Sequence, residues 1–220
     1  MNSKSIQQLY PESDDPSETG PRTDTIALDM DFTLTSDQQD LRRMVRDLSD
    51  DRASSAQLRA AIESTDGYDA ELWRLLTGDL GLVGVAVPEG LGGAGGSFVD
   101  AAVVLEESGR ALWPVPLLAN LVGVAALCSG DPTAAGLAES VASGERSVAL
   151  AVCADLKASG ETISGTATHV VDGHRADLIV VAGPDALWLV DGGRHFVTAT
   201  GRRSLDLTRW LATIELEEAL

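Results

Sequence analysis

The chain has 220 residues, enough for one large domain or two small ones. Hydrophobic residues make up 44% of it and aromatic residues only 4%, so its core is expected to be built from Leu, Val and Ala. The formal net charge of -18 argues against nucleic acid and anionic membranes as partners, because both repel an acidic protein. An anionic ligand would need a local group of Arg, Lys or backbone N–H donors.

The two cysteines, Cys128 and Cys153, form no Cys-X-X-Cys pair, and the three histidines are scattered. Neither a disulfide framework nor a metal site is predicted, and a reducing cytoplasm is the expected location. The N-terminal segment lacks the apolar core of a signal peptide, and no apolar run is long enough to span a membrane.

Residues 1–29 are predicted to be a disordered acidic tail. They contain Pro11, Pro16 and Pro21, several acids and few large apolar side chains. Such a segment cannot bury enough surface to offset its ordering entropy.

Helical signals follow. Thr35 or Ser36 is a suitable N-cap, and Leu41, Met44 and Leu48 then recur at helical spacing. The later helices are expected at residues 58–62, 68–76, 98–112, 117–127 and 134–142. Between them, residues 82–88 are a short buried run, and residues 89–96, with five glycines, must be a loop. The nearly continuous apolar run at 117–127 is expected to be a buried helix.

The pattern changes near Arg146 to short β-type runs separated by turn residues. Strands are expected at residues 148–153, 162–171, 178–182, 187–190, 196–198 and 212–216. The sequence therefore predicts an α+β fold, with an all-α domain at residues 30–145 and a small antiparallel, barrel-like β domain at residues 146–220.

A series of motifs then occurs in a specific order. Leu72-Trp73 is followed by Leu80-Gly81-Leu82-Val83-Gly84, by Val87-Pro88-Glu89, by Gly92-Gly93-Ala94-Gly95 and by Val104 to Leu112. This series, begun by Asp31 to Gln38 and continued by Trp113 to Leu118, resembles the acyl-CoA dehydrogenase family over residues 30–220. The glycine loop is expected to be mainly architectural, because it lacks the spacing of a phosphate-binding loop.

The resemblance implies a FAD site in the β domain. Residues 165–177 align with the family's G-x-K-x-W/F-I/V-T/S-N-G segment, which places His169 at the aromatic position near the flavin, with Val170 after it. Val171 replaces the hydroxyl residue that bonds the flavin edge, and a valine side chain has no donor. A surface or core role for His169 is an equal alternative.

Residues 151–155 correspond to the family's A-x-T-E-P strand, with Cys153 in place of the threonine. The Gly-Ser-Asp loop that usually follows is missing. The cofactor-binding candidates implied by the resemblance are therefore Cys153, His169, Val170 and Val171, partly through backbone groups. Cys153 itself is expected to be a small buried residue.

In the family, a C-terminal four-helix domain carries the glutamate that removes the α-proton of the thioester while the β-hydride passes to the flavin. No carboxylate here matches that position, and Glu217 and Glu218 are expected to be solvated. We therefore assign no catalytic residue. Helices 98–112 and 117–127 would form one wall of the acyl tunnel.

Four interpretations follow from the resemblance. In the first, the chain is a subunit that contributes part of a FAD and acyl-CoA site, which a partner chain completes. In the second, it is a non-catalytic scaffold that has lost FAD. The third is a truncated acyl-CoA dehydrogenase, and the fourth is a catalyst of another flavin reaction, which no residue favours. Without the helical bundle, the apolar faces of residues 98–127 would be partly bare. A homo- or hetero-oligomer with an acyl-CoA dehydrogenase-like chain is therefore expected.

Overall fold

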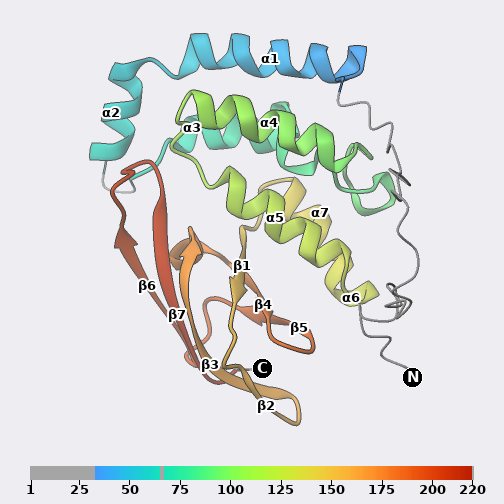
Figure 1. Cartoon of the computed structure of the whole chain (residues 1–220), viewed down its shortest axis with the longest axis vertical. Helices are drawn as coiled ribbons and strands as arrows, with labels where there is room; N and C mark the ends of the chain where they lie inside the picture. Colours follow the sequence, from blue (N-terminus) through green and yellow to red (C-terminus); the bar gives the residue numbers. More distant parts are fainter. Residues whose placement is uncertain (1–32, 65–66, 220) are drawn as a thin grey trace, which may run out of the picture. The chain divides into compact units, whose positions relative to one another are not determined.

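Thr35 caps the first helix of the computed structural model, which describes residues 33–64 and 67–219 (Figure 1). Its side chain accepts a hydrogen bond from the Gln38 backbone, and the Gln38 side chain accepts one from the Thr35 backbone. This capping box fixes the first turn of α1 (Ser36–Arg52) and confirms the predicted helix start. The predicted tail at residues 1–29 lies outside the described residues.

Helices occupy the first part of the described chain. After α1 come α2 (Ser55–Glu63), α3 (Ala70–Arg74), α4 (Phe98–Arg110), α5 (Leu117–Cys128), α6 (Pro132–Ala135) and α7 (Ala138–Ala142). Short π- or 3₁₀-helical turns are η2 (Leu75–Asp79), η3 (Leu82–Gly84), η4 (Glu89–Leu91) and, later in the chain, η5 (Gly173–Arg175). Within the described ranges, no helix is long and apolar enough to cross a membrane.

Strands occupy the second part and form two sheets (Figure 1). They are β1 (Val148–Val152), β2 (Lys157–Ser159), β3 (Thr162–Val171), β4 (Leu178–Ala182), β5 (Leu187–Asp191), β6 (Val197–Arg203) and β7 (Trp210–Ala219). One sheet has the order β1-β4-β5 and the other β2-β3-β7-β6. The predicted fold class, helices followed by a mainly antiparallel β part, is confirmed.

β1 and β4 pair in parallel, which differs from the predicted antiparallel pairing. The reason is that β2 and β3 lie between them in the sequence but belong to the other sheet. The chain therefore crosses to the second sheet and returns to β4 in the direction of β1, as a parallel pair requires. The short strand β2 is absent from the sequence prediction.

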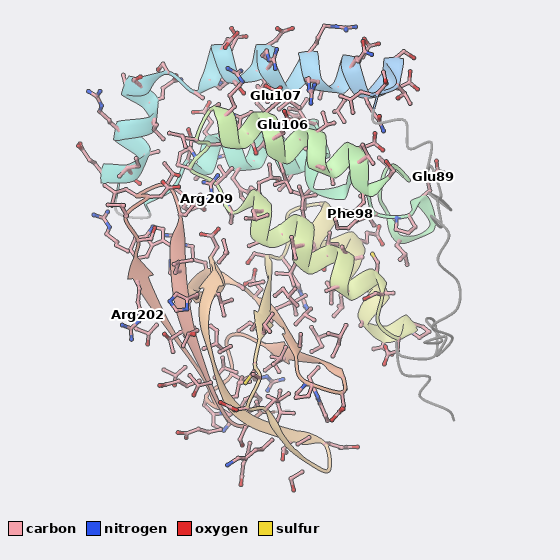
Figure 2. The ribbon with its side chains drawn as sticks, viewed as in Figure 1. Glu89, Phe98, Glu106, Glu107, Arg202 and Arg209 are labelled. Atoms are coloured by element: carbon pink, nitrogen blue, oxygen red, sulfur yellow. The ribbon has the colours of Figure 1, made fainter. Side chains whose placement is uncertain are left out.

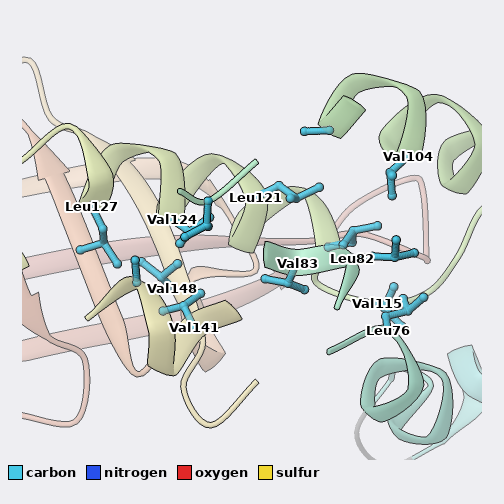
Figure 3. Close-up of a cluster of buried hydrophobic side chains, with 14 of the residues drawn as sticks. Leu76, Leu82, Val83, Val104, Val115, Leu121, Val124, Leu127, Val141 and Val148 are labelled. Atoms are coloured by element: carbon cyan, nitrogen blue, oxygen red, sulfur yellow. The ribbon is translucent and has the colours of Figure 1, made fainter. Parts of the chain in front are cut away.

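The helical and β parts share an apolar core. Figure 3 shows this cluster, in which Val148 of β1 packs among helical side chains, including Val124 and Leu127 of α5. The buried Asn120 also links the two parts: its side-chain oxygen accepts from the Val148 backbone at 2.9 Å, and its side-chain nitrogen donates to the Pro116 carbonyl at 2.8 Å. Both polar groups of this buried amide are thus satisfied.

A buried carboxylate joins α1 to α4. Glu107 is only 1% exposed and accepts two hydrogen bonds from Arg46 and one from Arg110 (Figure 2). Arg42 lies 3.5 Å from the same carboxylate and also pairs with the exposed Glu106. Because Arg46 donates directly to it, the pKa of Glu107 is lowered.

The glycine-rich loop folds back on the segment before it. Backbone N–H groups of Ala94, Gly95 and Gly96 donate to carbonyls in residues 84–87. A Cβ atom at Gly93 would lie 2.2 Å from the Val87 carbonyl oxygen, so no larger residue fits there. These contacts support the predicted architectural role.

Candidate functional site

One of the two irregularities in the pairing of β3 with β7 is a bulge in β3. Ala167 pairs with Ile214 and Val170 with Ala212, so β3 holds one more residue than β7 between these two pairs. Within this bulge, His169 adopts a φ of 59°, a left-handed conformation that costs energy for a residue with a Cβ. Bulges redirect side chains and often occur beside functional sites, where such strain is retained.

The bulge opens onto a groove of about 430 Å³ on the outer side of the four-stranded sheet. Its lining is polar and cationic at β3 and β6 and more apolar at β7. The residues are Thr168, His169, Arg202, Arg203, Leu211, Ala212 and Thr213. This volume lies within the range of sites for small molecules and cofactors.

The two arginines of the groove differ in how they are held. Arg203 donates to the Ile62 carbonyl at 3.2 Å and stacks over the Trp210 ring at 5.5 Å. Arg202 lies on the edge strand β6 (Figure 2), and in the described part of the chain no hydrogen bond or ion pair of its side chain is recorded. Its charge is thus available to an anionic ligand, although the chain as a whole is strongly acidic.

No Asp or Glu is among the described residues that line the groove. It therefore offers cations, hydroxyls and an imidazole, but no carboxylate that could act as a general base. The described residues also contain no cluster of His, Cys, Asp or Glu suited to a metal ion.

Only His169 of the four candidates from the sequence lines the groove. Cys153 is 1% exposed, and its thiol lies 3.5 Å from the Thr166 carbonyl in the core of the β part. The Val170 side chain is buried in the same core, and Val171 is half-buried. Contacts from Cys153 or Val170 to a cofactor would have to use backbone atoms.

The sequence analysis did not identify the threonines and arginines of the groove. A signal was present for the arginines, because Arg202 and Arg203 are adjacent in a chain with only 16 basic residues. For Thr168 and Thr213 there was none, because their meeting depends on the register of β3 against β7.

A compact polar cluster lies where β3 ends. Asp172 has a φ of 51° and is buried, and burial raises the pKa of its carboxyl to about 6. The Nε2 atom of His174 accepts from Arg175 at 2.8 Å, and the two residues contact the Trp210 ring. Burial lowers the pKa of His174. Because Arg175 also stacks on Tyr68, this cluster connects the β part to the helical part.

Comparison with known proteins places this geometry in context. Residues 35–145 match the family described as acyl-CoA dehydrogenase, N-terminal domain. Over 190 residues the chain is 38% identical to acyl-CoA dehydrogenase IpdE2 of Mycobacterium tuberculosis, covering 85% of this chain and 54% of that protein. IpdE2 of Mycolicibacterium smegmatis is 36% identical, with 82% and 52% covered.

Two solved structures have the same fold with a TM-score of 0.76 each. The ChsE4-ChsE5 complex from Mycobacterium tuberculosis is 30% identical, with 86% of this chain and 56% of that chain covered. A variant of the Tcur3481-Tcur3483 steroid ACAD is 29% identical, with 85% and 56% covered. The chain thus spans about half the length of the relatives it matches.

Proposed function

Because this chain belongs to the acyl-CoA dehydrogenase family, we propose that it contributes part of a FAD and acyl-CoA site for α,β-dehydrogenation of an acyl thioester. The main observation behind this proposal is the groove at the β3 bulge, which is lined by His169 in its strained backbone conformation. A cytoplasmic location is part of the same proposal and fits the two free cysteines.

The residues of the groove fit a flavin. Its volume of about 430 Å³ suits one planar ring system, and its floor is a sheet surface. The chemistry that FAD would supply when bound is acceptance of a hydride from the acyl chain. His169 would pack against the ring, the hydroxyls of Thr168 and Thr213 would bond polar edges, and Arg202 would balance negative charge.

We assign the catalytic base to a partner chain. The reaction requires a group that removes the α-proton, and the described lining of the groove contains no carboxylate. The ChsE4-ChsE5 complex and the Tcur3481-Tcur3483 protein are each named for two components. By analogy, we propose that this chain assembles with an acyl-CoA dehydrogenase-like chain that completes the site.

A second candidate is a non-catalytic scaffold without flavin. It is favoured by the side chains at three positions where the family segments have polar residues: Ala167 stands at the lysine position, Cys153 at the threonine position and Val171 at the hydroxyl position. Ala167 and Cys153 are buried and Val171 is half-buried, and none of them offers a strong side-chain donor.

Visible spectroscopy separates the two candidates. The chain is purified alone and after co-expression with acyl-CoA dehydrogenase-like genes from its own genome. Flavin absorbance that depends on the partner, and that is reduced by His169→Ala but not by His195→Ala, is the expected result. If no preparation holds flavin, the dehydrogenase proposal is wrong and the scaffold remains.

A further inference from the structure

Trp210 adjoins the groove of β3, β6 and β7 without lining it. It is the first residue of β7, and it pairs with Arg203, the last residue of β6 (Figure 1). Its neighbours Leu211 and Ala212 belong to the lining of the groove, as does Arg203. The half-buried indole of Trp210 therefore affects a ligand in the groove only through the side chains that it contacts.

Two guanidinium groups lie over the Trp210 ring. The central carbon of Arg203 is 5.5 Å from the ring centroid, and that of Arg175 is 5.7 Å from it. Both distances are within the roughly 6 Å over which the face of an indole attracts a cation. Arg175 also lies 4.8 Å from the centre of the Tyr68 ring, so the stack connects the groove arginine to the helical part.

The Trp210 ring is closely enclosed by its surroundings. A Cβ atom at Gly67, where φ is 63°, would lie 3.0 Å from the indole nitrogen, and the His174 ring is 4.9 Å from the Trp210 ring between centroids. The His174 ring would in turn lie 3.0 Å from a Cβ atom at Gly201. Rings packed this closely do not rotate freely, so Trp210 offers Arg203 a fixed surface.

Arg203 is held at two points. Its Nη2 atom donates to the Ile62 carbonyl at 3.2 Å, and its guanidinium lies over Trp210. A side chain that is already ordered loses less rotamer freedom when it binds a ligand. One recorded hydrogen bond leaves most of the five guanidinium N–H donors for an anion, and among the described residues that line the groove no carboxylate competes for them.

We propose that Trp210 is a positioning residue, which holds Arg203 at the groove as a group that binds a phosphate-type anion. A guanidinium binds phosphate through paired hydrogen bonds, so its orientation matters as well as its charge. For the adjacent Arg202, no comparable ring contact or hydrogen bond is recorded in the described part of the chain. The inference rests on the proposed function in one respect, because the ligand that carries phosphates would be the FAD proposed above.

The position of Arg203 is measured first, in the isotope-labelled wild-type chain without ligand. The ring current of an indole shifts the resonance of a proton above its face to higher field. We therefore expect the Arg203 Nε–H resonance to lie upfield of that of Arg202, and to move back toward it in Trp210→Leu. Trp210→Phe, which keeps an aromatic face, should retain most of the shift. Trp188→Leu, at a half-buried tryptophan of the other sheet, should leave it unchanged.

The groove is then titrated with inorganic phosphate, and binding is followed through the Arg202 and Arg203 resonances. We expect Trp210→Leu to weaken phosphate binding about fivefold, as the loss of a cation–π contact implies, and Trp210→Phe to weaken it less. Arg203→Gln should weaken it about tenfold. Adding Trp210→Leu to Arg203→Gln should cause no further loss, because Trp210 acts through Arg203.

Three results would overturn the inference: an Arg203 resonance at its ordinary position in the wild-type chain, phosphate that leaves this resonance unmoved, or a loss in the double variant that equals the product of the two single losses. The first measurement needs no variant, so it decides even if Trp210→Leu does not fold. Flavin is read separately, in the co-purified preparations. Phosphate results as expected without flavin in any preparation would contradict the proposed function alone, whereas bound flavin with an unshifted Arg203 resonance would contradict only the positioning role.

Discussion

Two buried carboxylates, Glu107 in the helical part and Asp172 in the β part, have pKa shifts of opposite direction. At Glu107, the hydrogen bonds from Arg46 are the strongest influence and lower the pKa in spite of burial. At Asp172, burial is the strongest influence and raises the pKa to about 6, although the charges of Arg209 and Arg175 oppose it.

The difference shows that burial alone does not decide the charge of a carboxylate. What decides it is whether hydrogen bonds and nearby charges outweigh burial. At Glu107 the hydrogen bonds from Arg46 do so, whereas at Asp172 the two arginines and a backbone hydrogen bond with Trp210 do not. In the helical part, charge serves to hold α1 on α4. In the β part, burial disfavours the charged form of the Asp172 carboxyl.

The largest expected effect is a loss of stability when the Glu107 carboxylate, which joins α1 to α4, is removed. Glu107→Gln removes the common partner of three half-exposed arginines, and we expect the free energy of unfolding to fall by about 3 kcal/mol in urea denaturation. Glu106→Gln is the control, because that carboxylate is exposed and its loss should cost about 0.5 kcal/mol or less. Equal losses in the two variants would show that the buried cluster has no special role.

The second effect concerns Asp172 and depends on pH. Its pKa is about 6 in the folded chain against an ordinary value of 3.8, so the folded state binds the proton more tightly than the unfolded state. The stabilisation is therefore complete below pH 3.8 and is lost as the pH rises through about 6. Glu107, with its lowered pKa, contributes in the opposite sense and loses its stabilisation as the pH falls.

Asp172→Asn should remove this pH dependence. Asparagine is neutral and tolerates the left-handed backbone at this position, so the variant should be about 2 kcal/mol more stable than the wild-type chain near neutral pH. The gain should vanish toward pH 3.8 in denaturation curves. Asp185→Asn, at an exposed position, should show no such gain.

Local patterns in the sequence predict much of the fold. The range of β3 was predicted to the residue, and the capping residue of α1 was one of two proposed, because alternation and capping chemistry are local. The parallel pairing of β1 with β4 was missed because it depends on which sheet the strands between them join. The short strand β2 has only exposed residues, so no apolar pattern marks it.

The candidate site was predictable only in part. His169 was identified through the family motif, but nothing local indicates that a bulge would turn its side chain onto a groove. Cys153 and Val170 align with the same motifs, yet their side chains face the core. Arg202 enters the groove through the pairing of β6 with β7, which joins residues that no sequence motif connects.

A smaller effect on stability is expected at the β3 bulge, where one substitution distinguishes backbone strain at His169 from flavin binding by its side chain. His169→Gly should stabilise the fold by about 1 kcal/mol, because glycine adopts a φ of 59° without the cost that a Cβ imposes. The same variant should bind flavin less tightly, because the imidazole no longer packs on the ring. His195→Gly, an exposed histidine outside the positive-φ residues, should not stabilise the fold. A loss of stability in His169→Gly would mean that the imidazole makes favourable contacts in the folded chain.

The smallest effect on stability is expected at the groove arginine. Arg202→Gln removes an exposed charge, so the free energy of unfolding should change by less than about 0.5 kcal/mol. Flavin affinity, measured by fluorescence quenching in the complex that retains flavin, should fall about tenfold, because a neutral amide cannot balance a phosphate or ring charge. Arg194→Gln is the matched control: it changes the net charge equally, but Arg194 pairs with Asp191 away from the groove. If both variants weaken flavin binding equally, the long-range charge of the chain is responsible. A loss of flavin affinity confined to Arg202→Gln would show that this arginine, which faces a groove without a carboxylate, binds the ligand. The arginines around Glu107, in contrast, hold the fold.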